Sequence, residues 1–132
     1  MAKSSLIKKL RILPGQPILI LNPPPEYIES LGELPEGATI TVQTEGQFNF
    51  VHLFVKDSRE FDKLSPIALK ALEYDGLFWI SYPKRSSKVE TDLSRDVFWE
   101  LLTDAGLRPV TQISIDDTWS ALRFRPSELV GK

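Results

Sequence analysis

The sequence predicts an α/β fold: a three-layer, Rossmann-like, mostly parallel sheet of about six strands that ends in an antiparallel hairpin. Three short apolar runs support this prediction, because each has the length of a strand buried on both faces. Segments with helical spacing lie between these runs, and such alternation favours a parallel sheet with right-handed crossovers. Two strand-like segments near the end of the chain are joined by a short polar link, which favours an antiparallel hairpin.

The first half of the chain contains three predicted strands. Pro17–Leu21 is fully apolar and follows a Pro-Gly turn. A short helix is expected over about Pro24–Leu31, because Asn22 can cap it and proline is tolerated in a first turn. Thr39–Gln43 alternates and is β-branched, so we expect a half-exposed edge strand there. Phe50–Val55 is the next buried strand.

The middle of the chain predicts a helix and then the third buried strand. Asp57 begins a pattern that resembles a capping box. Pro66 lies inside the helical pattern, and an interior proline costs about 3 kcal/mol, so we expect a second helical segment to start at Ser65-Pro66. An Asp-Gly pair at 75–76 is expected to close it, before the strand Leu77–Tyr82.

The last third predicts one helix and the hairpin. Thr91 is expected to cap a helix that continues through Ala105, with Gly106 as its stop. The hairpin strands are Val110–Ile115 and Trp119–Phe124. The 132 residues fit a single α/β domain over 1–132, with a lead segment or short helix over 1–13 and a flexible tail over 126–132.

Composition excludes several classes of site. The chain has no cysteine and one histidine, so thiolate chemistry and a metal site with several histidines are excluded, and no metal is expected. A net charge of -2 gives no general attraction to nucleic acid or acidic membranes, and neither is expected as a partner. The absence of cysteine fits a cytoplasmic protein. No apolar run reaches the length of about 20 residues that a spanning helix needs. The oligomeric state does not follow from the sequence.

Three segments resemble a known family. They are Phe50–Phe54, Leu77–Asp92 and Ile115–Phe124, of which Tyr-Pro-Lys and Asp-Asp-Thr-Trp-Ser are the most specific parts. They resemble a bacterial family of small proteins catalogued as a domain of unknown function, over about Lys9 to Arg125. The resemblance implies no particular activity.

A second, architectural resemblance is to S-adenosylmethionine-dependent methyltransferases, whose sheet also ends in an antiparallel hairpin. Nucleotide-binding folds place glycines after the first strand, so that backbone N–H groups approach the ligand. Here that strand is followed by Asn22 and three prolines, which have no N–H, and the chain has no G-x-G and no P-loop. No cofactor is therefore expected, and S-adenosylmethionine is kept as the alternative that the resemblance implies.

The loop from Pro83 to Asp92 is the main candidate site. It follows a predicted parallel strand and leads into a helix N-terminus, where free N–H groups and the helix dipole favour an anion. Its side chains supply donors suited to phosphate or carboxylate, and the predicted anion-binding residues are Lys84, Arg85, Ser86, Ser87 and Lys88. The alternative is a solvated charged loop in which Thr91 and Asp92 only cap the helix.

The link between the hairpin strands is a second candidate. Asp116 and Asp117 could serve as catalytic acid and base, although aspartate is common in turns. If the two loops are neighbours, these carboxylates could instead pair with Lys84 or Arg85.

Several further side chains are predicted near the strand ends or in the core. Asn22, Tyr82 and Trp119 are predicted to line a pocket at the strand ends. His52 lies inside an apolar strand and is expected to be a hydrogen-bonded core residue. With a single histidine, no serine has an evident base.

The pattern favours a non-catalytic or degenerate Rossmann-like module that binds a small anion or a protein partner. The alternative is a small methyltransferase-like enzyme with a divergent cofactor pocket.

Overall fold

The computed structural model describes residues 5–25, 27–31, 34–41, 43, 45–84 and 91–130. The strands are β1 Pro17–Leu21, β2 Thr39–Thr41, β3 Phe48–Phe54, β4 Leu72–Pro83, β5 Leu107–Ser114 and β6 Trp119–Pro126. The helices are α1 Ser5–Leu10, α2 Tyr27–Ser30, α3 Ser58–Ala71 and α4 Arg95–Thr103, with a short 3-10 helix, η1, at Ser127–Leu129.

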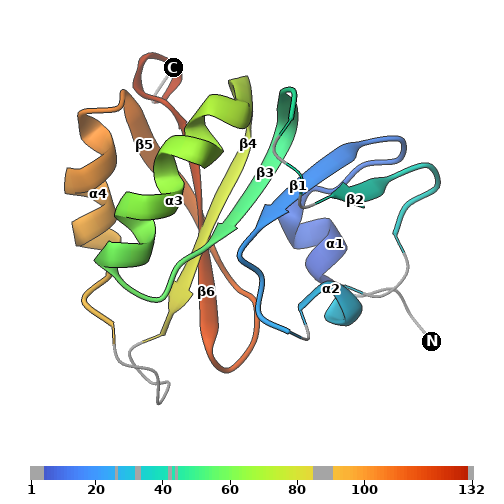
Figure 1. The fold of residues 1–132 in the computed structure, drawn as a ribbon, viewed down its shortest axis with the longest axis horizontal. Coiled ribbons are helices and arrows are strands. Elements are labelled where there is room, and N and C mark those ends of the chain that lie inside the picture. The colour runs from blue at the N-terminus through green and yellow to red at the C-terminus, as the bar shows by residue number, and fades with distance from the viewer. Residues whose placement is uncertain are drawn as a thin grey trace.

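The strands form one six-stranded sheet in the order β2-β1-β3-β4-β6-β5. The first four strands of this order pair in parallel, and β6 runs antiparallel to both β4 and β5. The predicted mostly parallel sheet, the edge position of β2 and the terminal hairpin are therefore confirmed. The carboxyl ends of β1, β3 and β4 point to the lower edge of the sheet in Figure 1.

Helices cover both faces of the sheet, which gives the predicted three layers. Figure 1 shows α3 and α4 side by side in front of the sheet. Phe61 of α3 and Phe98 of α4 belong to the apolar core of that face. Leu10 of α1 and Tyr27 of α2 belong to the core of the opposite face. The apolar side of α1 is buried, so this short helix packs on the sheet.

The helix predicted to restart at Pro66 is continuous instead. α3 runs unbroken from Ser58 to Ala71 with Pro66 inside it. Its buried stripe of Phe61, Ser65, Ala68 and Ala71 spans both sides of the proline. Packing of this stripe on one sheet face offsets the cost of the lost backbone bond. Asp57 caps the helix as predicted, since its carboxylate accepts the N–H of Glu60.

The end of α3 was predicted too late in the chain. The helix ends at Ala71, and β4 begins at Leu72 rather than at Leu77. Around Asp75, which has a φ of 56°, the pairing with β3 is interrupted. The next residue, Gly76, lies where a side chain would be crowded. A Cβ added there would lie 3.0 Å from the Asn49 Cα and 3.1 Å from the Glu73 carbonyl oxygen. The Asp-Gly pair therefore forms an irregularity within the strand, not a helix stop.

The helix predicted from Thr91 to Ala105 is shorter, and Ser94 caps it. The Ser94 hydroxyl accepts the Val97 N–H, and α4 ends at Thr103. Asp92 bonds instead to Ser58 at the start of α3. The Asp92 carboxylate accepts the backbone N–H of Ser58 at 2.8 Å and the hydroxyl of Ser58 at 2.5 Å. These bonds lower the pKa of Asp92. The chain before Ser94 is thereby held against α3 and cannot begin α4.

The remaining predictions concern the tail and the membrane. Residues 126–129, predicted as part of a tail, form the end of β6 and η1. Among the residues described, no helix has the length and apolar character needed to cross a bilayer.

Candidate functional site

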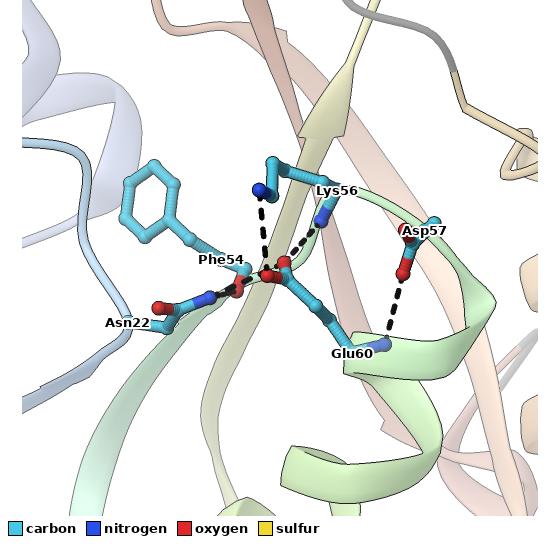
Figure 2. Close-up of polar contacts among 5 residues, drawn as sticks. All are labelled: Asn22, Phe54, Lys56, Asp57 and Glu60. Carbon is cyan, nitrogen blue, oxygen red and sulfur yellow. Dashed lines mark hydrogen bonds and ion pairs between the residues drawn. The ribbon is translucent and has the colours of Figure 1, made fainter.

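The first candidate position is the crevice between the carboxyl ends of β1 and β3. The connection from β1 leads to β2 on one side, and the connection from β3 leads to β4 on the other. Ligands of open α/β sheets bind at such a switch point. Here a side chain spans it: the Asn22 amide donates to the Phe54 carbonyl oxygen at 2.9 Å and to Glu60 Oε1 at 3.3 Å. Figure 2 shows this bridge.

Glu60 extends the bridge toward the start of α3. Its carboxylate accepts the backbone N–H of Lys56 at 2.7 Å and lies 3.8 Å from the Lys56 ammonium group (Figure 2). The three prolines after Asn22 supply no N–H to this crevice. The crevice is thus crossed by internal hydrogen bonds and presents a carboxylate, an arrangement that disfavours an anionic ligand.

Asn22→Ala is expected to lower the free energy of unfolding by about 2 kcal/mol. Asn22 has a φ of 58°, which costs alanine about 1 kcal/mol or more, and loss of its side-chain bonds costs about 1 kcal/mol. Urea denaturation measures the loss. Asn22→Gly is the matched control, because glycine accepts this backbone conformation and loses only the bonds. A cost for glycine as large as that for alanine would contradict the assignment.

The second candidate position is a pocket of about 290 Å³ at the carboxyl end of β4. Its lining residues are Tyr82, Lys84, Leu93, Ser94, Arg95, Asp96, Gln112 and Ser120. They come from the ends of β4 and β5 and from the starts of β6 and α4. Among the residues that the structure describes, two cations and one carboxylate line the pocket, and the Gln112 amide donates to the Tyr82 hydroxyl at 3.2 Å. This described lining therefore combines positive side chains with neutral hydrogen-bonding groups.

The predicted neighbourhood of the two candidate loops is confirmed at Lys84. Its backbone N–H donates to the Thr118 carbonyl oxygen at 2.7 Å, and its ammonium group donates to the Ser114 hydroxyl at 2.7 Å. Asp116 is a turn residue, since its Oδ1 accepts the N–H groups of both Thr118 and Trp119 at 2.8 Å. Asp117 is exposed, and no described contact supports a catalytic role for either aspartate.

The predicted pocket residues separate in the structure. Lys84 and Tyr82 line the β4 pocket, whereas Asn22 bridges β1 and β3 and Trp119 packs edge-on against Phe54. Arg85, Ser86, Ser87 and Lys88 lie outside the described residues. The sequence prediction missed Ser94, Arg95, Gln112 and Ser120. Gln112 and Ser120 could have been predicted as pocket residues only on the assumption that the β5–β6 hairpin pairs with β4.

The prediction that no serine has a base nearby is wrong. The Ser81 hydroxyl lies 2.6 Å from Nε2 of His52, and the Tyr27 hydroxyl lies 3.0 Å from Nδ1. All three side chains are buried, and burial lowers the pKa of His52 from 6.5 to about 3. The imidazole is thus a neutral, hydrogen-bonded core group, as predicted for His52 itself. Strands β3 and β4 place it beside Ser81, which the sequence could not show.

Comparison with known proteins supports the fold. No protein-family model and no curated protein sequence matches the chain, so the resemblance to a small bacterial family stays a prediction. Solved structures do match. Phosphoethanolamine N-methyltransferase 2 of Haemonchus contortus, in complex with S-adenosyl-L-methionine, has a TM-score of 0.51 at 15% identity, covering 88% of this chain and 35% of that chain. DhpI, in complex with SAH, has a TM-score of 0.50 at 14% identity, covering 83% and 66%.

A third match is the N-methyltransferase NodS of Bradyrhizobium japonicum WM9, in complex with S-adenosyl-L-homocysteine. Its TM-score is 0.49 at 16% identity, and the match covers 83% of this chain and 66% of that chain. The chain spans about two thirds of the NodS and DhpI chains and about a third of the Haemonchus protein.

The β1–β3 crevice does not fit the usual placement of an adenosyl cofactor. The turn after β1 offers prolines in place of glycines, and the Asn22 side chain bonds across the carboxyl ends of β1 and β3 to Phe54 and on to Glu60. The β4 pocket, in contrast, is lined by Lys84, Arg95 and neutral hydrogen-bonding groups. At identities of 14% and 15%, the matches with TM-scores of 0.50 and 0.51 show the fold alone: the chain has the α/β, Rossmann-like fold of these two proteins.

Proposed function

We propose that this chain is a ligand-binding domain of methyltransferase-like fold and that it binds a small anion in the β4 pocket. The observation that carries the proposal is the convergence of Lys84 and Arg95 on one pocket with the Tyr82 hydroxyl and the Gln112 amide. Ammonium and guanidinium groups make charge-assisted hydrogen bonds to carboxylate and phosphate.

The surroundings of the pocket support the same ligand class. The pocket lies at the carboxyl edge of the sheet, where ligands of this fold class bind. α4 begins beside it, so the positive end of the helix dipole adds to the two cations. Asp96 also lines the pocket, so one carboxylate lies beside the two cations of the described lining, and the volume of about 290 Å³ suits a small anion.

Thermal unfolding in the presence of inorganic phosphate, citrate or adenosine 5′-phosphate tests the proposal. At least one of these probes is expected to stabilise the protein in a concentration-dependent way, by about 2.7 kcal/mol at a hundred times its Kd. Lys84→Ala combined with Arg95→Ala should weaken that probe at least about tenfold, since charge-assisted bonds contribute about 1.5 to 3 kcal/mol each.

Two single variants complete this test. Asp96→Asn is expected to tighten binding of the same anion, because it removes a carboxylate from the described pocket lining. Lys63→Ala changes an exposed lysine of α3 and should leave binding unchanged. Equal binding by the wild type and the Lys84/Arg95 double variant would overturn the assignment.

The comparisons favour a second candidate, a methyltransferase-like enzyme that binds S-adenosylmethionine in a divergent pocket. DhpI and the Haemonchus contortus enzyme, which match with TM-scores of 0.50 and 0.51, are complexes with SAH and with S-adenosyl-L-methionine. Calorimetric titration with S-adenosylmethionine and S-adenosylhomocysteine tests it. Binding in the β1–β3 crevice would respond to Glu60→Gln and be insensitive to Arg95→Ala. Binding in the β4 pocket would be weakened by Arg95→Ala and unchanged by Glu60→Gln. If millimolar ligand releases no heat of binding, this candidate function is wrong.

A further inference from the structure

A second pocket lies at the opposite, amino edge of the strands that form the proposed anion site. It has a volume of about 350 Å³ and is bounded by the start of β4, the end of α4 and the end of β6. Its apolar lining residues are Leu69, Leu72, Ala105, Leu107, Phe124 and Pro126. The volume falls within the range of about 300 to 1,000 Å³ that is typical of small-molecule pockets.

Carboxylates form the polar part of this pocket. Glu73, Asp75 and Glu128 line it, and its described lining includes no lysine or arginine. Asp75 is neutralised from outside the lining, because its two oxygens accept from the Arg125 guanidinium at 3.0 and 2.9 Å. This ion pair lowers the pKa of Asp75. The exposed residues Glu73 and Glu128 therefore leave about two negative charges beside an apolar floor.

An aromatic side chain stands at the same rim. Tyr74 is 70% exposed, although large aromatic residues are usually buried. Its hydroxyl donates to Glu128 at 2.7 Å, which holds the ring next to a carboxylate. An exposed ring beside carboxylates is an arrangement that attracts organic cations, since the ring face is negative.

We propose that this pocket binds a small organic cation, an ammonium group carried on an apolar body. The apolar body would contact Leu72, Leu107 and Phe124, while the ammonium group lies between Tyr74 and the carboxylates of Glu73 and Glu128. An anion would be repelled by these carboxylates, and a neutral apolar ligand would not compensate their charge. The site is separate from the proposed anion pocket and does not depend on it.

Titration followed by nuclear magnetic resonance tests the proposal with three molecules of similar shape. Phenethylammonium is expected to bind saturably and to shift the amide signals of Tyr74, Gly76 and Leu107. Phenethyl alcohol should bind more weakly by about two- to fivefold, because it lacks the charge. Phenylpropanoate should not bind. Equal affinity for the ammonium and the alcohol, or no saturable binding of the ammonium, would overturn the proposal.

Variants of exposed side chains then locate the site. Tyr74→Ala should weaken phenethylammonium about two- to fivefold, whereas Tyr74→Phe keeps the ring and should bind like the wild type. The double variant Glu73→Gln, Glu128→Gln should weaken it further and abolish the preference over the alcohol. Glu100→Gln, an exposed glutamate of α4 away from the pocket, is the matched control. Unchanged binding by the glutamine double variant would contradict the assignment.

Discussion

Lowering the pH from about 6.5 to 5 is expected to reduce the free energy of unfolding by about 2 kcal/mol through His52. Burial lowers the pKa of His52 to about 3 in the folded protein, against 6.5 in the unfolded chain. Below pH 6.5 the unfolded chain therefore takes up a proton that the folded protein does not, and stability falls by about 1.4 kcal/mol per pH unit. Above pH 6.5 this dependence fades, and it is nearly absent by about pH 7.5, where the unfolded chain is also neutral at His52.

The hydrogen bonds around His52 give the physical reason for the size of this effect. A neutral imidazole has one donor and one acceptor nitrogen, which the hydroxyls of Ser81 and Tyr27 can satisfy. A protonated imidazole would be a charge enclosed by apolar side chains, stacked on Phe54, with no carboxylate partner among its described contacts. The folded protein therefore excludes the proton until the pH is far below the ordinary value.

Urea denaturation at several pH values between about 5 and 7.5 measures this slope. His52 is the only histidine in the sequence, so no other histidine contributes to this window. His52→Gln should be less stable at neutral pH and lose most of the slope. Tyr27→Phe should also be less stable but keep the slope, because the buried histidine is still present. A wild-type protein with constant stability over this range would refute the assignment.

The sequence predicts the sheet well because three of its strands are marked by largely apolar runs. Leu19, Val51 and Phe78 lie in such runs, and all are fully buried. The hairpin was predicted for a similar reason, since a short polar turn leaves the second strand little choice but to return beside the first. These features are local in the chain, so they can be recognised without knowing which elements pack together.

The errors occur where a distant contact outweighs a local preference. Pro66 does not interrupt α3, because the buried side of the helix packs on the sheet on both sides of the proline. Thr91 does not cap α4, because the neighbouring Asp92 bonds to Ser58, 34 residues earlier in the chain. Neither contact has a signature in the local sequence, so tertiary packing decides both boundaries.

The candidate site shows the same difference between residues that the local sequence identifies and residues that only the folded arrangement brings together. Lys84 was predicted to bind an anion because it follows a parallel strand, and that position does place it in the β4 pocket. Gln112 and Ser120 could be assigned to the pocket only after the order β4-β6-β5 was known. Ser81 and His52 meet because β3 and β4 are neighbours in parallel register, a pairing that the sequence implies only through the fold as a whole.

Phe98→Ala is expected to lower the free energy of unfolding by about 3 to 5 kcal/mol, the range found when a buried phenylalanine is truncated. Phe98 is fully buried, and its ring contacts Phe61 of α3, Tyr82 of β4 and Phe124 of β6 at centroid distances of 5.6, 5.1 and 6.2 Å. It thus joins α4 both to the neighbouring helix and to the sheet. Urea denaturation measures the loss.

The same substitution should affect the proposed anion site, because α4 is only nine residues long and carries Ser94, Arg95 and Asp96 at its start. With Phe98 removed, Leu102 is the one other fully buried anchor within the helix, so we expect weaker anion binding even where the domain stays folded. Trp99→Ala is the control: Trp99 is 46% exposed and contacts Arg108, so its loss should cost about 1 kcal/mol or less and leave binding unchanged. Equal losses of stability for the two variants would show that α4 is not held by its buried face.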